Sequence, residues 1–280
     1  MNINSFESVV PTALYTAYPL IFTDIPYAKE IFEELDCIGI PNNLLNSKLA
    51  VELEARYKLI DKLLDRTKIS SIYELAAGFT ARGLNRCKSD KNLIYLELDL
   101  PQVIDKKEKL LSKSTKLPDN LHLLSGNVLK NKDFFQCEKY FNNSKPIAVI
   151  NQGLMRYLDF KEKRQLAVNI YSLLKKNGGV WITCDVTPMD FIINQEKNIK
   201  DYNKRLSAVT DRNNANWRFK NKEEVNRFFW EIGFDIEWHD FYEVKNELVS
   251  PKNLNYSDKE VDLLLAHAVV VVMTIKKAGV

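Results

Sequence analysis

Short apolar runs separated by polar or amphipathic stretches fill the sequence from about residue 70 onward, and this alternation most constrains the fold. The runs lie at 72–77, 93–98, 121–124, 147–151 and 180–184. Among the stretches between them, 160–179 places Leu166, Ile170, Leu173 and Leu174 at helical spacing before Gly178 ends the pattern. Strands that alternate with helices predict an α/β fold with a parallel sheet covered on both faces.

The rest of the chain shows a different pattern of apolar residues. Residues 1–68 show helix-period patterns broken by prolines and contain no convincing strand, and 187–232 again looks helical. Two further strand candidates, 233–241 and 266–277, close the chain. We therefore expect a helical N-terminal lid at 1–68 and a core at 69–280 that contains a cap insertion at about 187–232.

Composition narrows the class of partner. The chain has 280 residues and a net charge of only +3, and its Lys and Arg residues are scattered among Asp and Glu. Such a distribution argues against a dedicated nucleic-acid surface.

The four cysteines, Cys37, Cys87, Cys137 and Cys184, lie far apart without CxxC or histidine spacing, so free thiols are favoured over a metal site or disulfides. No signal-peptide pattern opens the sequence, and the longest apolar run, 266–275, is too short to span a bilayer. We expect a cytoplasmic protein that does not enter a membrane.

The segment IYELAAGFTARGL at 72–84 indicates a ligand-binding turn between the first strand and the following helix. The small residues Ala76 and Gly78 allow the backbone to approach a ligand closely, and the helix start offers free N–H groups. About twenty residues later the second strand ends with Glu97 and Asp99, where a carboxylate can bind the hydroxyls of a ribose. A turn followed by a spaced acid favours a nucleoside ligand.

Two nucleoside cofactors fit this geometry, NAD and S-adenosylmethionine. A pyrophosphate requires a glycine-rich loop of the GxGxxG type, whereas this loop reads A-x-G-x-x-A and lacks the first glycine. S-adenosylmethionine carries no phosphate but needs a partner for its carboxylate. The loop therefore favours S-adenosylmethionine.

Several blocks, in this order, resemble the leucine carboxyl methyltransferase family, with closer likeness to its bacterial branch of polyketide-type O-methyltransferases. They read TALYTAYPLIFTDIPYAKEIF, YELAAGFTARGL, LIYLELDLPQVIDKKEKLL and IAVINQGLMRYLDFKEKRQLAVNIYSLLKKNGGVWITCDV. The resemblance implies a class I, Rossmann-like methyltransferase fold with a seven-stranded sheet, an antiparallel last strand and S-adenosylmethionine as methyl donor. It also accounts for an insertion before the closing strands, where such folds place a substrate cap.

The resemblance also implies roles for individual residues. Arg56 corresponds to the arginine that binds the cofactor carboxylate, and Asp99 to the acid that binds the ribose, with Glu97 as a neighbour on the same side of the strand. In the turn after the third strand, Asn127 is expected to bind the adenine edge and Val128 to pack on the ring.

The first loop adds Glu74, Ala76 and Gly78 to the expected cofactor site. Family members typically have glutamate at the position of Gln152, where it helps to hold the amino group of the cofactor. Glutamine loses that charge, which weakens the hydrogen bond by about 1 kcal/mol.

The sequence assigns no catalytic residue. Arg156 and Tyr157, just past the fourth strand, are the candidates near the acceptor, with Asp185 after the fifth strand and His239 near the cap as further positions to test. No metal is expected.

The sequence leads to one main hypothesis and two alternatives. The main hypothesis is an O-methyltransferase that uses S-adenosylmethionine to methylate a hydroxyl or carboxyl oxygen of a small molecule, or a carboxyl group of a peptide. The second is a family member that binds the cofactor or a partner without turnover, suggested by Gln152. The third is an NAD(P)-dependent dehydrogenase, supported only by the YxxxK pair Tyr171 and Lys175.

Overall fold

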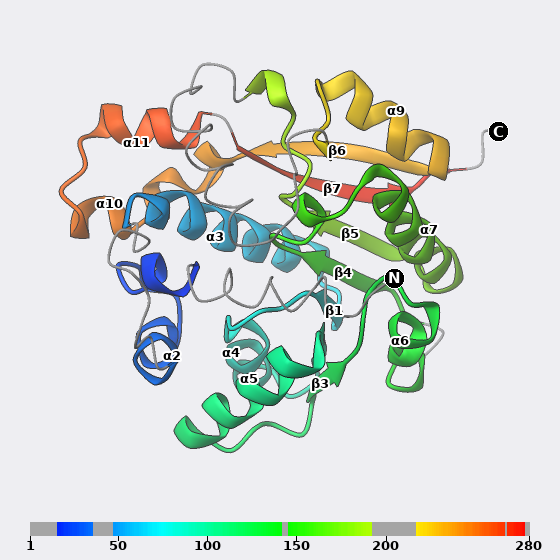
Figure 1. Cartoon of the computed structure of the whole chain (residues 1–280), viewed down its shortest axis with the longest axis horizontal. Coiled ribbons are helices and arrows are strands. Elements are labelled where there is room, and N and C mark those ends of the chain that lie inside the picture. The colour runs from blue at the N-terminus through cyan, green and yellow to red at the C-terminus, as the bar shows by residue number, and fades with distance from the viewer. Residues whose placement is uncertain (1–15, 36–46, 142–144, 192–216, 267, 278–280) are drawn as a thin grey trace.

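A computed structural model describes residues 16–35, 47–141, 145–191, 217–266 and 268–277, and its centre is one seven-stranded sheet in the order β3-β2-β1-β4-β5-β7-β6 (Figure 1). The strand β7 runs antiparallel to both of its neighbours, and the first five strands are mutually parallel. The expected class I methyltransferase fold is therefore confirmed. The strands are β1 (Ser71–Leu75), β2 (Ile94–Asp99), β3 (Leu121–Ser125), β4 (Ile147–Asn151), β5 (Gly179–Thr183), β6 (Phe234–Asp240) and β7 (Val269–Ile275).

Helices cover both faces of the sheet. One face packs against α3 (Ala50–Thr67), α4 (Arg82–Ser89) and α5 (Pro101–Ser114), and the other against α6 (Asn131–Phe134), α7 (Phe160–Asn177) and α9 (Lys222–Ile232). The remaining helices are α2 (Ala28–Glu34), α10 (Ser250–Asn253) and α11 (Asp258–Leu265), with 3₁₀ turns η4 (Ser47–Leu49), η5 (Phe135–Lys139), η6 (Met155–Tyr157), η7 (Met189–Phe191) and η10 (Phe241–Glu247). No helix in these described ranges is long and apolar enough to cross a membrane.

Strand alternation divides the core into two layers. Ile72 of β1 belongs to the cluster under α3, α4 and α5, whereas Tyr73 and Leu75 belong to the cluster under α7 and α9. Successive side chains of a strand point to opposite faces. Glu74 therefore faces α4, and it is buried there at 2% exposure.

The helix α3 joins the predicted lid to the core. Its residues Val51, Leu59 and Leu63 belong to the same buried cluster as the strands, and α3 also packs along η10. The lid at 1–68 and the core at 69–280 remain a predicted division of the chain. Residues 1–15 of that lid, 192–216 of the predicted cap, Cys37 and His267 lie outside the described residues.

Most predicted elements agree with the structure to within a few residues. The helix expected at 160–179 is α7, which begins with a capping box between Asp159 and Glu162 and ends at Gly178. The strand expected at 266–277 is shorter: β7 runs from Val269 to Ile275, and Ala266 is the C-cap of α11. The strand expected at 72–77 stops at Leu75 because Ala76 adopts a left-handed backbone conformation.

Two adjacent glycines at the start of β5 provide a test of this packing. Both have positive φ, 77° at Gly178 and 116° at Gly179, but a β-carbon on Gly179 would lie 2.0 Å from the carbonyl oxygen of Ile147, whereas one on Gly178 would meet nothing within 4 Å. Gly179→Ala is expected to lower the free energy of unfolding by about 3–5 kcal/mol, since backbone strain adds to overpacking. Gly178→Ala, the matched control, meets no clash but has φ 77° and ψ 176°, a region that L residues rarely adopt, and should cost about 1–3 kcal/mol. Urea unfolding of both variants measures the difference, and equal losses would contradict the close packing of β4 on β5.

Candidate functional site

A cavity of about 1600 Å³, its open mouth included, lies at the carboxyl ends of β1, β2, β3 and β4. The strand order reverses between β1 and β4, and open α/β sheets bind ligands at such a switch point. The cavity wall is formed by residues 76–81, Asp99 and Leu100, residues 126–129, and residues 152–154 and 156–158. Apolar residues of the N-terminal segment close it from another side, namely Ala17, Leu20, Ile25, Pro26, Ala28 and Ile31.

The loop after β1 makes a tight turn despite its missing glycine. Ala76 has φ 53° and Gly78 has φ 54°, so two residues of the turn occupy the left-handed region. The N–H of Ala76 donates to the carbonyl oxygen of Leu98 at 2.7 Å, which fixes the turn against β2. An alanine thus takes a conformation that glycine adopts at lower cost.

Asp99 joins the first two loops at the cavity wall. One carboxylate oxygen accepts from the N–H of Gly78 and the other from the N–H of Leu100, each at 2.7 Å. Burial raises the pKa of Asp99, and the two N–H donors oppose that shift. Each oxygen retains a lone pair, so the carboxylate can also accept hydroxyl donors from a ligand.

The turn after β3 brings Asn127 and Val128 to the cavity. The N–H of Asn127 donates to the carboxylate of Asp133, and its side-chain oxygen accepts from the N–H of Leu129, both at 2.9 Å. The side-chain nitrogen makes no hydrogen bond to a described residue and can donate to a ligand. Val128 is 8% exposed and supplies an apolar contact at the same place.

Glu97 lies outside the cavity wall. It is fully buried and forms an ion pair with Lys107 of α5, which is 1% exposed. Burial raises the pKa of Glu97 to about 7, although Lys107 opposes the shift. Strand alternation correctly places Glu97 and Asp99 on one side, but only Asp99 lies at the strand end, next to the cavity. Every other residue expected to bind the cofactor lines the cavity: Arg56, Glu74, Ala76, Gly78, Asp99, Asn127, Val128 and Gln152.

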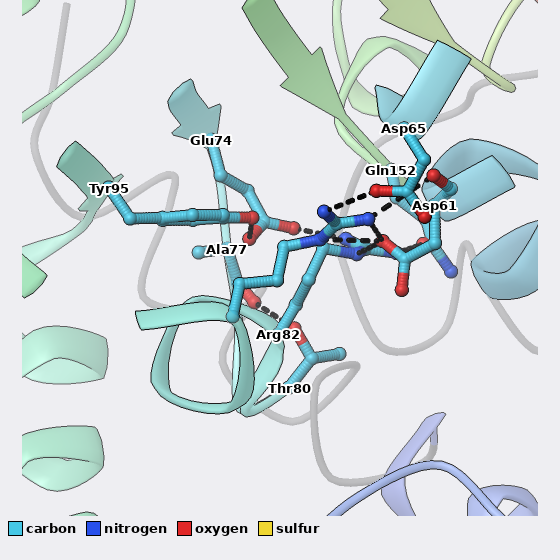
Figure 2. Close-up of polar contacts among 9 residues, drawn as sticks. Asp61, Asp65, Glu74, Ala77, Thr80, Arg82, Tyr95 and Gln152 are labelled. Atoms are coloured by element: carbon cyan, nitrogen blue, oxygen red, sulfur yellow. Dashed lines mark hydrogen bonds and ion pairs between the residues drawn. The ribbon is translucent and has the colours of Figure 1, made fainter. Parts of the chain in front are cut away.

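Arg82, at the start of α4, forms a buried polar network that sequence reasoning missed (Figure 2). Its Nε donates to Asp61 at 3.0 Å, its Nη1 to Glu74, and its Nη2 to the side-chain oxygen of Gln152 at 3.0 Å. Glu74 also accepts from the hydroxyl of Tyr95 at 2.7 Å. Only an arginine's five N–H donors reach three separate segments in this way. In sequence the only signal for this role is a basic residue between small residues in the segment TARGL.

The acceptor candidates Arg156 and Tyr157 line the cavity, beside Arg56 of α3. Arg56 is 6% exposed and its Nη2 pairs with Glu52, while its buried Nε has no hydrogen-bond partner among the described residues. Two guanidinium groups therefore line the cavity, and that of Arg56 is already paired with Glu52.

Asp185 serves the loop after β4 instead of the cavity. Its carboxylate accepts from the side chain of Asn151 and from the backbone N–H groups of Gly153, Leu154 and Met155, at 2.7–3.1 Å. It does not line the cavity. Four donors occupy the lone pairs that a general base would use, so Asp185 acts as a support for the loop.

The other chemistry-bearing residues considered from sequence lie elsewhere. His239 on β6 pairs with Glu243 at 2.6 Å and does not line the cavity, nor do Tyr171 and Lys175 of the dehydrogenase-type pair. The thiols of Cys87, Cys137 and Cys184 are free and buried. Among the described residues, no group of three or more His, Cys, Asp or Glu side chains is arranged to hold a metal ion.

The left-handed conformation of Ala76 predicts a stabilising substitution. Ala76→Gly is expected to raise the free energy of unfolding by about 0.5–1 kcal/mol, because glycine removes the left-handed penalty although it adds chain entropy to the unfolded state. The control is Ala77→Gly, whose φ is not positive and which should destabilise by about 0.5–1 kcal/mol. Denaturant unfolding checks both, and a loss of stability in Ala76→Gly would argue against the turn described here.

The Glu97–Lys107 pair predicts a dependence of stability on pH. Because the pKa of Glu97 is raised from 4.5 to about 7 in the folded state, the native chain binds more protons than the unfolded chain within that window. The stabilisation from this group is complete below pH 4.5 and is lost as pH rises through about 7. The double variant Glu97→Met, Lys107→Met should lack this decline, and urea unfolding between pH 4.5 and pH 7.5 compares it with wild type.

The same double variant tests whether Glu97 contacts a ligand. Replacing both partners is expected to leave stability near neutral pH unchanged or raised by about 1–4 kcal/mol, whereas Lys107→Met alone should be less stable than the double variant, because it removes the partner of Glu97. Since neither side chain lines the cavity, the affinity of the double variant for S-adenosylhomocysteine should equal that of wild type. A large loss of affinity would place Glu97 in the ligand site after all.

Comparison with known proteins agrees with this geometry. The family model described as leucine carboxyl methyltransferase matches residues 41–171. That range contains β1 to β4 and most of the cavity wall. The match agrees with the resemblance read from sequence over those residues, while the polyketide-type branch stays a prediction. No curated protein matches the sequence.

Solved structures share the fold at low identity. A DUF574 family protein from Streptomyces avermitilis superposes with a TM-score of 0.60 at 10% identity, covering 95% of this chain and 97% of its own. An O-methyltransferase family protein from Burkholderia thailandensis gives 0.51 at 13% identity, covering 91% and 72%. Human N-acetylserotonin methyltransferase, solved in complex with S-adenosylmethionine, gives 0.50 at 9% identity, covering 91% and 59%. Over residues 41–171 the chain therefore matches the leucine carboxyl methyltransferase family in sequence. The strand order and strand directions of the whole sheet are those of the class I methyltransferase fold.

Proposed function

We propose that this protein is an O-methyltransferase that transfers the methyl group of S-adenosylmethionine to a carboxylate oxygen of a small molecule or peptide. The observation that carries the proposal is Asp99 at the carboxyl end of β2, in the wall of the cavity, with both of its oxygens fixed by backbone N–H groups. A carboxylate held in this way is ready to accept the two hydroxyls of a ribose.

The neighbouring groups fit the remainder of the cofactor. Asn127 offers a side-chain N–H donor and Val128 an apolar contact for an adenine ring. Arg56 offers a buried guanidinium for the carboxylate of the methionine part. The loop after β1 approaches without the dense donors that a pyrophosphate needs, which favours this cofactor over NAD.

The acceptor side of the cavity favours an oxygen that is already ionised. Among the described residues that line the cavity there is no His, Lys or Cys, and the two carboxylates, Glu74 and Asp99, are engaged by donors. A hydroxyl acceptor requires a general base, whereas a carboxylate needs none. Arg156 and Arg56 offer positive charge to an anionic acceptor, and this supports a carboxylate over an alcohol.

Bound S-adenosylmethionine supplies an electrophilic methyl group on a sulfonium. The task of the chain is to align the acceptor oxygen with that methyl group and to exclude water. Apolar side chains of the N-terminal segment, such as Leu20 and Ile25, form a dry wall for this purpose. Asp185 fixes the loop that presents Arg156 and Tyr157, so the acceptor meets residues held in place before it binds.

A binding protein without turnover is the alternative, and the observation that favours it is Gln152. Its side-chain oxygen is neutral and already accepts one hydrogen bond from Arg82, so it holds a cofactor amino group less strongly than a glutamate carboxylate would. Cofactor binding combined with no methyl transfer to any of a range of carboxylates and phenols would support this alternative.

Isothermal titration with S-adenosylmethionine, S-adenosylhomocysteine and NAD tests the cofactor directly. We expect both adenosyl ligands to bind and NAD not to bind. Asp99→Ala should weaken S-adenosylhomocysteine binding about 10–100-fold, the equivalent of losing hydrogen bonds to a charged group. Asp105→Ala, an exposed acid on α5 that does not line the cavity, is the matched control and should bind like wild type. Tight NAD binding, or no adenosyl binding, would overturn the proposal.

A further inference from the structure

The Arg82 guanidinium is fully buried, yet it does not line the cavity. Its side chain is 1% exposed, and the central carbon of its guanidinium group, Cζ, lies 4.1 Å from the centre of the Tyr57 ring. Around it lie Asp61 of α3, Glu74 of β1 and Gln152 of the loop after β4, as Figure 2 shows for the three polar contacts. These segments are distant in sequence, and one side chain holds them together.

Three of the groups that contact Arg82 form part of the cavity wall: Tyr57, Glu74 and Gln152. Arg56, which lines the cavity, directly precedes Tyr57 on the same helix, α3. A shift of Arg82 would therefore move several residues of the ligand site at once. Arginine donates in a rigid planar fork, so it fixes the directions of its partners as well as their distances.

Arg82 also fixes the orientation of the Gln152 amide. An arginine side chain can only donate, so the oxygen of Gln152 must face Arg82, and the amide nitrogen must face away from it. That nitrogen makes no hydrogen bond to a described residue, and Gln152 lines the cavity. In this orientation, the Gln152 side chain offers its N–H group to a ligand as a hydrogen-bond donor.

We infer that Arg82 is a positioning residue for the ligand site, which acts by holding Glu74 and Gln152 and by turning the amide N–H of Gln152 toward the ligand. The inference rests on the proposed function for the identity of the ligand. The hydrogen bond between Arg82 and Gln152 is a contact within the protein itself and does not depend on which ligand binds. The group that Gln152 contacts must then be a hydrogen-bond acceptor, such as a carboxylate or hydroxyl oxygen.

A double-mutant cycle tests the inference, with S-adenosylhomocysteine as the probe. Arg82→Lys keeps the charge but loses the fork, and we expect it to weaken binding at least tenfold, as should Gln152→Ala. The double variant should lose clearly less than the product of the two single effects, because the two residues act together. Additive losses, or normal binding by Arg82→Lys, would overturn the inference.

Arg86→Lys is the matched control for the cycle. Arg86 lies on the same helix and contacts the same Asp61, at 3.3 Å, but its other partner is Asp65 and it reaches no residue of the cavity wall. If Arg82 only joined α3 to α4, as Arg86 does, the two lysine variants would bind S-adenosylhomocysteine with the same affinity. We expect Arg86→Lys to bind within about twofold of wild type, and an equal loss in both variants would reduce Arg82 to such a clamp.

A measurement without ligand separates this inference from the proposed function. The side-chain NH₂ resonances of Gln152 can be identified as the pair missing from the amide spectrum of Gln152→Ala. Arg82→Lys should shift that pair, and Arg86→Lys should not. If Arg82→Lys does not fold, Asp61→Asn, at a side chain that is 25% exposed, loosens the same guanidinium and should shift the pair as well. An unshifted pair would refute the coupling, whereas a shifted pair in a protein that binds no adenosyl ligand would count against the proposed function only.

Discussion

Burial of the positive charge on Arg82 requires its partners to be in place together. Removing a guanidinium from water costs several kcal/mol, and only close anionic and polar partners offset that cost. The partners here come from α3, β1 and the loop after β4. Strand β1, helix α3 and the loop after β4 are therefore tied to one another through Arg82, and a shift of any of them would break one of the contacts that offset the burial of this charge.

A second constraint acts at the neighbouring loops. Asp99 receives N–H groups from Gly78 and Leu100, and the N–H of Gly126 donates to the Asp99 backbone oxygen at 2.9 Å. The loops after β1, β2 and β3 are thus joined around one residue. Together with Asp185, which holds the loop after β4, these contacts keep four loops of the cavity in fixed relation before any ligand binds. A site that is organised in advance avoids an ordering cost when the ligand arrives.

The sequence anticipated the strands well because five of them are short, mostly apolar runs, as expected for strands buried on both faces. It anticipated the site through the spacing between Gly78 and Asp99 and through the family resemblance. It could not distinguish Glu97 from Asp99, because both alternate to the same side, and the difference lies in Lys107, which reaches Glu97 from α5. It also could not show that four donors engage Asp185, since three of them are backbone groups of a loop.

The sequence by itself therefore determined the order of strands and helices and the turn at Ala76 to Gly78, because apolar periodicity and turn chemistry are local properties of the chain. Tertiary structure alone decided which polar residues line the cavity. The side chains of Glu97 and Asp185 are as polar as that of Asp99. In the folded chain, however, Glu97 pairs with Lys107, and Asp185 accepts hydrogen bonds from the loop after β4. Likewise only the fold brings Arg82 to Gln152, 70 residues away, and so determines which end of that amide is left for the cavity.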